Sequence, residues 1–321
     1  MCYYATKVEF YPAFFHGNDG IRQIKGPCGQ ALRQKRIGML FPKKRSVFMT
    51  FWEAFFCGLI QGLTEFLPVS SSGHLALAHT FFGLETEASY LSFDILLHLA
   101  TLFVVFVVYH RDIFALLPAF FTMPVKLLKS KFRVEALQEA ERMALLLVIA
   151  TLPLVGAFFV KDYLTWMIGY VRLIGGLLAL NGLLLLIADR FSKKKGNSSL
   201  SLKGALGVGL FQLLATVPGI SRSGATISGG MLFGLSRENA VKFSFLMSVP
   251  AIIGANIFNL PEAFSVAVPA SELGFYAVGM LTALVSGFGA MKFLSYISAK
   301  EKFGFFAYYC ITIGLAVFFF C

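Results

Sequence analysis

Two related stretches, GLIQGLTEFLPVSSSGH (58–74) and GLFQLLATVPGISRSGA (209–225), decide how this chain folds. At an offset of 151 residues, both begin with Gly-Leu-x-Gln and end with Ser-x-Ser-Gly, with a proline in between. Each stretch interrupts a longer apolar region, 51–84 or 204–235, and leaves arms of roughly 10–16 residues, which are too short to cross a bilayer. The pattern predicts two re-entrant helical hairpins, which are tolerated at membrane depth only where protein or a wet cavity surrounds them.

The composition predicts the class of protein. The chain has 321 residues, of which 57% are hydrophobic and only 14% are charged, whereas soluble domains are about one-quarter charged. Several apolar windows reach the roughly 20 residues that a membrane-spanning helix needs. We therefore expect an all-α polytopic membrane protein whose six full spans accompany the two hairpins and lie near 89–109, 142–161, 168–189, 239–259, 275–297 and 303–321.

The two hairpins belong to an internal repeat. Repeat one covers about 51–161 and repeat two about 204–297, and a second echo pairs FDILLHLA at 93 with FSFLMSVP at 243. Three predicted spans separate the hairpins, so the hairpins must enter the membrane from opposite faces. This arrangement is the inverted-topology repeat found in many transporters, in which the binding site lies near the midplane. We expect the two tips to meet there.

Lys and Arg residues in the short connections predict the orientation. The basic residues of 110–141 and 190–203 fall on one side, with Lys300 and Lys302, and that side should be cytoplasmic. Residues 1–48 carry nine Lys/Arg against two Asp/Glu, a net charge of +7 on the external side, and no signal-peptide pattern. We expect 1–48 to be a dispensable, disordered or non-native extension of a membrane domain at 49–321, with no role in binding nucleic acid.

Other polar residues are expected to have structural roles. The five cysteines show no paired spacing and indicate neither a disulfide framework nor a zinc site. The serines of the first hairpin, taken alone, suit ordinary helix packing in a membrane equally well. We expect packing or interfacial roles for His98 and His110, and pairing across spans for Arg172, Asp94 and Asn181.

The two tips hold the residue types that phosphoryl transfer needs. Arg222 is functional by default, because an ionisable group at membrane depth costs roughly 2.5–3.5 kcal/mol. Glu65 and Gln61 are four residues apart on one helix face, where they could hold a divalent cation. His74 and a serine supply a nucleophile and a proton-transfer group. Gly-Ser turns at helix N-termini bind anions, so the phosphate cradle is predicted at Ser70, Ser72, Gly73, Ser221, Ser223 and Gly224.

Two motifs, GLIQGLTEFLPVSSSGHL (58–75) and PGISRSGATISGGMLFGLSRENAVKFSFLMSVPAIIGA (218–255), resemble those of the undecaprenyl-pyrophosphate phosphatase (BacA/UppP) family. The resemblance extends over about 49–321. It implies hydrolysis of undecaprenyl pyrophosphate to undecaprenyl phosphate and phosphate, which recycles the lipid carrier of peptidoglycan synthesis and confers bacitracin resistance. It also implies a divalent cation, Mg²⁺ or Ca²⁺, and a bacterial plasma (inner) membrane location with the active site facing the external, periplasmic side.

The same resemblance assigns roles to individual residues. The (E/Q)-x-x-x-E motif of the family falls on Gln61 and Glu65 as metal ligands, and Glu65 is the stronger candidate because position 61 lacks a carboxylate. The catalytic serine and histidine fall on Ser71 and His74, and which of the two attacks phosphorus is left open. The arginine of the SRSG motif falls on Arg222, and the same phosphate site includes Ser221, Ser223 and Thr226.

Two other classes of protein compete with this interpretation. Type-2 phosphatidate phosphatases need a second histidine after their SR motif, but the last histidine of this chain is His110, so the sequence excludes them. A transporter or flippase for the carrier lipid stays open, because a site between inverted repeats serves either purpose. Phosphate release would separate the two. The oligomeric state is also left open, with a homodimer as one option.

Overall fold

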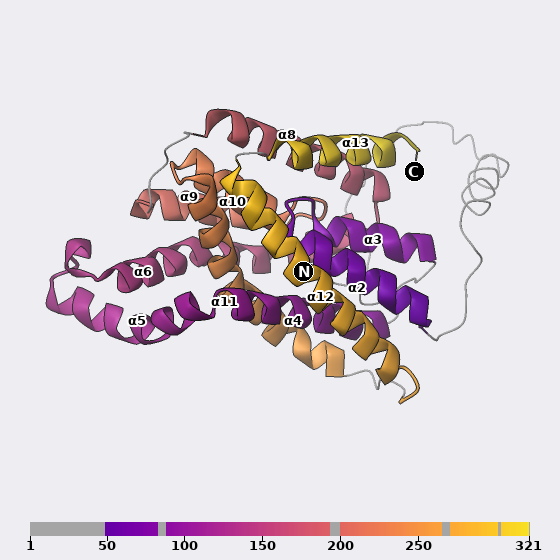
Figure 1. The fold of residues 1–321 in the computed structure, drawn as a ribbon, viewed down its shortest axis with the longest axis horizontal. Coiled ribbons are helices and arrows are strands. Elements are labelled where there is room, and N and C mark those ends of the chain that lie inside the picture. Colours follow the sequence, from indigo (N-terminus) through magenta and orange to yellow (C-terminus); the bar gives the residue numbers. More distant parts are fainter. Residues whose placement is uncertain (1–48, 83–87, 193–199, 265–269, 301–302, 321) are drawn as a thin grey trace, which may run out of the picture.

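The computed structural model describes residues 49–82, 88–192, 200–264, 270–300 and 303–320, and the regular elements there are all helical (Figure 1). The prediction for residues 1–48 lies outside the described residues. The elements are α2 Phe51–Phe66, α3 Ser71–Phe82, α4 Ala88–Val108, α5 His110–Lys129, η1 Val134–Ala136, α6 Glu139–Thr151, η2 Leu152–Val160, α7 Lys161–Ile168, α8 Val171–Phe191, α9 Leu202–Leu214, α10 Arg222–Leu232, α11 Arg237–Phe264, α12 Leu273–Ala299 and α13 Gly304–Phe320.

The first predicted hairpin is formed by α2 and α3. A capping box begins α2, in which Thr50 accepts from the backbone N–H of Glu53 and the Glu53 carboxylate accepts from that of Thr50. The helix ends before Pro68, because the residue preceding a proline is disfavoured in helical conformation. At the turn, Ser70 adopts a positive φ of 71°, a strained conformation of the kind that often marks functional sites.

The second hairpin, α9 and α10, repeats this construction. Ser221 caps α10 by accepting from the N–H of Gly224 at 3.1 Å, as Ser70 accepts from the N–H of Gly73 at 3.3 Å before α3. The shared Ser-x-Ser-Gly motif is therefore a pair of N-caps. In Figure 1, α2 and α3 reach the turn region from one end of the molecule, and α9 and α10 lie toward the other end.

The prediction of an all-α polytopic membrane protein is confirmed. Within the described ranges, four helical segments, 139–160, 171–191, 237–257 and 273–299, are long and apolar enough to span a membrane. Outward-facing side chains such as Phe121, Phe159 and Phe320 are 79%, 82% and 86% exposed, as expected of a surface that faces lipid.

Three parts of the span prediction differ in detail. Near 89–109, α4 continues after a 91° bend into α5, a 20-residue helix where we expected only a connection. The span at 142–161 changes from α-helix to a nine-residue 3₁₀ segment, η2, which contains Pro153, a residue that cannot donate a helical hydrogen bond. The last expected span, α13, has 17 residues and is only about 25 Å long at 1.5 Å per residue.

Matched glycines bring the hairpins close to helices of the other repeat. A Cβ at Gly58 of α2 would lie 2.3 Å from the carbonyl oxygen of Gly279 in α12. A Cβ at Gly209, its equivalent in α9, would lie 2.5 Å from the carbonyl oxygen of Ala150 in α6. Small residues of this kind allow helix backbones to approach closely in membranes. Each hairpin thus packs against a helix of the opposite repeat, and this packing brings the two tips together.

Candidate active site

The two tips meet directly, as predicted. Ser223 donates through Oγ to the carbonyl oxygen of Leu67 at 3.1 Å. Asn181 of α8 lies between the tips, where it donates through Nδ2 to the carbonyl of Pro68 at 3.1 Å and accepts through Oδ1 from the N–H of Ser221 at 3.0 Å. These contacts confirm that Asn181 pairs across spans, and they fix the relative position of the two hairpin turns.

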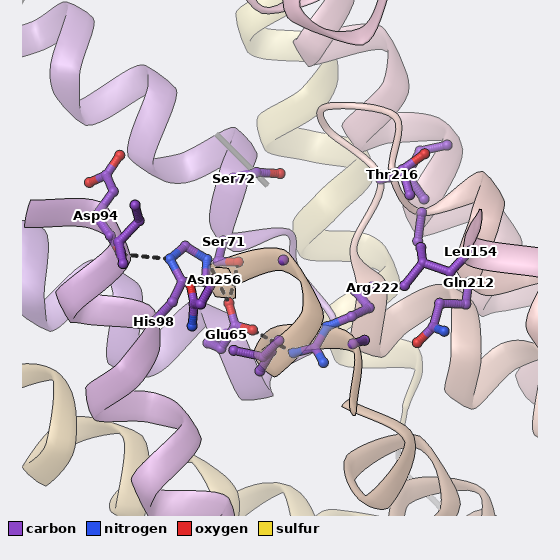
Figure 2. Close-up of a pocket in the computed structure, with 16 residues that line it drawn as sticks. Glu65, Ser71, Ser72, Asp94, His98, Leu154, Gln212, Thr216, Arg222 and Asn256 are labelled. Atoms are coloured by element: carbon purple, nitrogen blue, oxygen red, sulfur yellow. Dashed lines mark hydrogen bonds and ion pairs between the residues drawn. The ribbon is translucent and has the colours of Figure 1, made fainter. Parts of the chain in front are cut away.

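A pocket lies beside this junction (Figure 2). Both hairpins contribute to it, together with α4 and α11, and its wall includes apolar side chains from η2, α4, α11 and the second turn. A polar centre within apolar walls suits a ligand with a charged head and an apolar tail. Of the residues predicted for the site, four line the pocket: Glu65, Ser71, Ser72 and Arg222.

Glu65 is the centre of the polar network. Its side chain is only 5% exposed. Oε1 accepts from Nη2 of Arg222, while Oε2 accepts from Ser71 Oγ at 2.6 Å and from Gln61 Nε2 at 3.1 Å. Nε2 of His98 lies 3.8 Å from the same Oε2. Charge-assisted hydrogen bonds from several donors hold a carboxylate ionised. Glu65 is therefore an anionic proton acceptor in contact with a serine hydroxyl.

Ser71 is placed as an activated nucleophile. It is the first residue of α3, directly after the strained Ser70, and its hydroxyl points into the pocket toward Glu65. A nucleophile–base pair within about 2.6–3.2 Å is the usual signature of covalent catalysis. The first N–H groups of a helix also have no intrahelical partner and attract anions. The turn therefore combines a nucleophile with an electropositive helix end.

Arg222 occupies the equivalent position in the second repeat, because 71 and 222 differ by the repeat offset of 151. One arm of its guanidinium, Nη2, pairs with Glu65, whereas Nη1 is buried and has no hydrogen-bond partner among the described residues. A guanidinium binds phosphate through two parallel donors. Arg222 therefore retains one free donor for a ligand while it holds Glu65 in place.

His74 lies apart from this network, although the sequence predicts it as catalytic. Its Nε2 is 2.9 Å from the hydroxyl of Tyr309, its ring stacks on that of Tyr309, and its Nδ1 is 2.8 Å from the carbonyl oxygen of Ser70. It is absent from the pocket wall, and Ser71, not His74, contacts Glu65.

Most residues of the predicted phosphate cradle form hydrogen bonds that hold the two turns together. Ser70 and Ser221 are N-caps, and Gly73 and Gly224 are the residues whose N–H groups they accept from. Thr226 is buried and bonds to the carbonyl of Arg222 at 2.7 Å and to Ser244 at 2.6 Å. Ser223 donates to the carbonyl oxygen of Leu67. None of these residues lines the pocket.

Sequence reasoning missed several polar residues of the pocket wall. His98, expected to serve packing, lines the pocket beside Glu65, and its Nδ1 is held 2.8 Å from the carbonyl oxygen of Asp94. Gln212, Thr216 and Asn256 also line it. One signal was present in the sequence, since Gln212 is the repeat equivalent of Gln61. No comparable signal marked Asn256 in α11.

The described residues do not form a resident metal site. They contain no group of three His, Cys, Asp or Glu side chains arranged to hold a metal ion. Both oxygens of Glu65 are already engaged by donors, including a guanidinium, and Gln61 points its Nε2, a donor, at Glu65. Of the two predicted ligands, only Gln61 has a buried acceptor, Oε1, without a partner among the described residues, so a cation here would need water and substrate to supply most of its oxygen ligands.

The fold and the pocket together define a polytopic helical membrane protein with a polar site between two inverted hairpins. Residues 54–316 match the family described as bacitracin resistance protein BacA, and the chain belongs to this family.

Relatives named undecaprenyl-diphosphatase align with most of the length of this chain. That of Alkaliphilus metalliredigens is 41% identical over 272 residues, which are 84% of this chain and 98% of the relative. That of Rubrobacter xylanophilus is 40% identical over 269 residues, or 83% and 96% of the two chains. That of Methanobrevibacter smithii is 36% identical over 272 residues, again 83% and 96%.

Proposed function

We propose that this protein hydrolyses undecaprenyl pyrophosphate to undecaprenyl phosphate and inorganic phosphate, and so recycles the lipid carrier for peptidoglycan synthesis. The observation that carries the proposal is the hydrogen bond from Ser71 to Glu65, with Arg222 on the other oxygen of the same carboxylate. Membership of the BacA family and the name shared by its relatives support it independently. Bacitracin resistance follows from the same activity when the protein is abundant.

The geometry supports a two-step mechanism. Ser71 Oγ attacks the terminal phosphorus as its proton passes to Glu65, and the bond between that phosphorus and the bridging oxygen breaks. The leaving group is the lipid monophosphate, and the terminal phosphoryl group stays on Ser71. Glu65 passes its proton to the departing lipid phosphate, then takes a proton from the water that attacks the phosphoserine, and gives that proton to Ser71 Oγ as inorganic phosphate leaves. A positioned base typically contributes roughly 10²–10⁴-fold to each such step.

Arg222 supplies the positive charge for both steps. Its free Nη1 is placed to bind a phosphate oxygen, and charge that develops during phosphoryl transfer is stabilised by cations of this kind. The apolar part of the wall, which includes Ile95, Leu154 and Ile252, suits the first isoprene units of the lipid. A charged head and an apolar tail thus each meet a matching surface.

Two roles taken from the family resemblance stay proposals. A divalent cation, Mg²⁺ or Ca²⁺, rests on that resemblance alone, because the side chains around Glu65 do not form a metal site, and no step above passes through it. His74 retains its proposed part in catalysis as the neighbour of the Ser71 turn. In this structure its nearest polar partners are Tyr309 and the backbone of Ser70.

The setting of the reaction is also part of the proposal. We place the multi-pass chain in the bacterial plasma (inner) membrane with its pocket open to the external, periplasmic side, as the family resemblance implies and as the Lys and Arg distribution of the loops favours. The partners are the lipid substrate and the bilayer, without nucleic acid, and a homodimer is one option for its assembly.

Phosphate release from undecaprenyl pyrophosphate by the detergent-purified full chain tests the function. We expect stoichiometric formation of undecaprenyl phosphate and inorganic phosphate. A flippase for the same lipid, the alternative that the inverted repeat leaves open, would release no phosphate in detergent but would move the lipid across the membrane of reconstituted vesicles. That result would reject the phosphatase.

A further inference from the structure

Gln212 is a buried amide on the second hairpin. It lies on α9, is 1% exposed and lines the pocket. Neither its Nε2 nor its Oε1 has a hydrogen-bond partner among the described residues. Buried polar groups are almost always satisfied, so an amide that faces a pocket with both atoms free is expected to meet a ligand there.

A comparison of Gln212 with its repeat equivalent, Gln61, indicates the charge of the expected ligand. In repeat one, Gln61 is followed four residues later by Glu65, and the amide donates to that carboxylate at 3.1 Å. In repeat two, Gln212 is followed four residues later by Thr216, whose hydroxyl donates to the carbonyl of Leu213 at 2.8 Å. The second repeat thus keeps the donor and lacks the anion that the donor would bind. An anionic ligand would supply the hydrogen-bond acceptor that Glu65 supplies to Gln61 in repeat one.

The order of residues across the pocket identifies the part of the ligand that Gln212 meets. In Figure 2 the labelled side chains run from Asp94 through His98, Glu65 and Arg222 to Gln212, with Ser71 beside Glu65. The phosphorus attacked by Ser71 must lie close to Glu65. Gln212 lies beyond Arg222, at the end of the pocket remote from the Asp94 carboxylate, and so is placed for the second phosphate of a diphosphate.

We propose that Gln212 donates through Nε2 to the phosphate that stays on the lipid, and that this contact makes the site prefer diphosphates to monophosphates. The inference rests on the proposed function, because it concerns the leaving group of the same reaction. Gln212 and Nη1 of Arg222, which is also buried and free, would together hold the bridging region. The contact strengthens as negative charge collects on the departing lipid phosphate, so it assists bond cleavage as well as binding.

The test uses the detergent-purified full chain and two substitutions. Gln212→Met keeps the shape of the side chain and removes the donor. Ser228→Ala is the matched control, because Ser228 in α10 is equally buried and also lacks a partner within the described part of the chain, but does not line the pocket. The measurements are the midpoint of thermal unfolding, KM and kcat with undecaprenyl pyrophosphate, and inhibition by undecaprenyl phosphate and by inorganic phosphate.

For Gln212→Met we expect an equal or higher unfolding midpoint, because an unpaired polar atom leaves the interior. We also expect roughly tenfold weaker inhibition by undecaprenyl phosphate and a KM raised by roughly the same factor, as for loss of a hydrogen bond to a charged group. Inhibition by inorganic phosphate should change less than about twofold, since its site is the Ser71 end of the pocket. Ser228→Ala should leave every kinetic value at the wild-type level.

Three results would overturn the inference. They are an unchanged KM and unchanged inhibition by undecaprenyl phosphate, an equal loss of inhibition by both products, or a lowered unfolding midpoint with normal kinetics. A wild-type protein that releases no phosphate rejects the proposed function instead. Thermal stabilisation by undecaprenyl phosphate then still tests Gln212, because that measurement needs no turnover.

Discussion

Arg222 donates through Nη2 to Oε1 of Glu65 across 157 residues of sequence. The two side chains come from opposite hairpins, so their contact is also the contact between the two repeats. The partially buried ion pair leaves Oε2 of Glu65 to accept from Ser71 and leaves Nη1 of Arg222 without a partner in the described part of the chain. One interaction therefore positions the proton acceptor, the nucleophile and the phosphate-binding cation at the same time.

Glu65→Gln should reduce phosphate release by at least two orders of magnitude, because the amide cannot take the proton of Ser71. The variant should still fold, since an amide oxygen can accept from Arg222. Glu141→Gln is the matched control, because Glu141 also pairs with a basic residue, Lys126, at 2.7 Å, but does not line the pocket. Near-normal phosphate release by a folded Glu65→Gln protein would exclude Glu65 as the base.

The cation is tested separately with Gln61→Glu. If a divalent ion enters with the substrate at Glu65, a second carboxylate at position 61 should lower the Mg²⁺ or Ca²⁺ concentration needed for half-maximal activity. The measurement is phosphate release across a metal titration that begins in excess chelator. Wild-type activity that persists unchanged in the chelator would remove the cation from the proposal.

Ser71→Ala should abolish turnover, and rapid quenching of the wild-type reaction should trap the phosphoryl group on Ser71. Phosphoserine survives acid, whereas phosphohistidine does not, so the acid stability of the label identifies the nucleophile. His74→Ala should also lose most activity, and the double variant should be hardly worse than Ser71→Ala, because residues that act as a unit are not additive. An acid-labile label on His74 would exchange the two roles.

Arg222→Lys should remain severely impaired, although it keeps the positive charge. An ammonium lacks the planar fork and cannot bind Glu65 and a phosphate oxygen in the same way. Arg237→Lys provides the comparison, because Arg237 pairs with Asp189 at 2.9 Å outside the pocket. We expect it to retain its turnover. Hydrolysis and the unfolding midpoint are measured for both, and a stable Arg222→Ala protein with normal turnover would contradict the mechanism.

Gly58→Ala should destabilise the fold by about 1–3 kcal/mol, because its new methyl group would press on the carbonyl oxygen of Gly279. Gly289→Ala, in the same helix as Gly279, meets no atom within 4 Å and should stabilise by roughly 0.5–1 kcal/mol through helix propensity. Unfolding midpoints in one detergent check both. Equal midpoints for the two variants would show that α2 and α12 can move apart to accommodate the methyl group without loss of stability.

A chain that begins at Met49 should insert and hydrolyse its substrate as the full chain does. The family match begins at residue 54, and every residue placed in the site lies beyond it. Membrane insertion and phosphate release of the shortened chain are compared with those of the full chain. If the shortened protein inserts well but is inactive, residues 1–48 have a function that the sequence did not reveal.

The sequence alone determined those features that depend on near neighbours. Pro68 ends α2, and Ser70 and Ser221 cap the helices that follow, because these effects act over one to four residues. The four-residue spacing of Gln61 and Glu65 fixed their contact in the same way. The two hairpins were predictable for this reason, and membrane depth made Glu65 and Arg222 site candidates, whereas the choice of Ser71 among the serines came from the family resemblance.

Only the tertiary structure decided which of those candidates share the pocket. The close approach of α2 to α12 and of α9 to α6, permitted by Gly58 and Gly209, sets the tips in the register that joins Glu65 to Arg222. The same packing turns His98 and Gln212 into the pocket and leaves His74 beside Tyr309. Helix periodicity gives the relative directions of side chains on one helix, but which face meets the pocket depends on how distant helices pack.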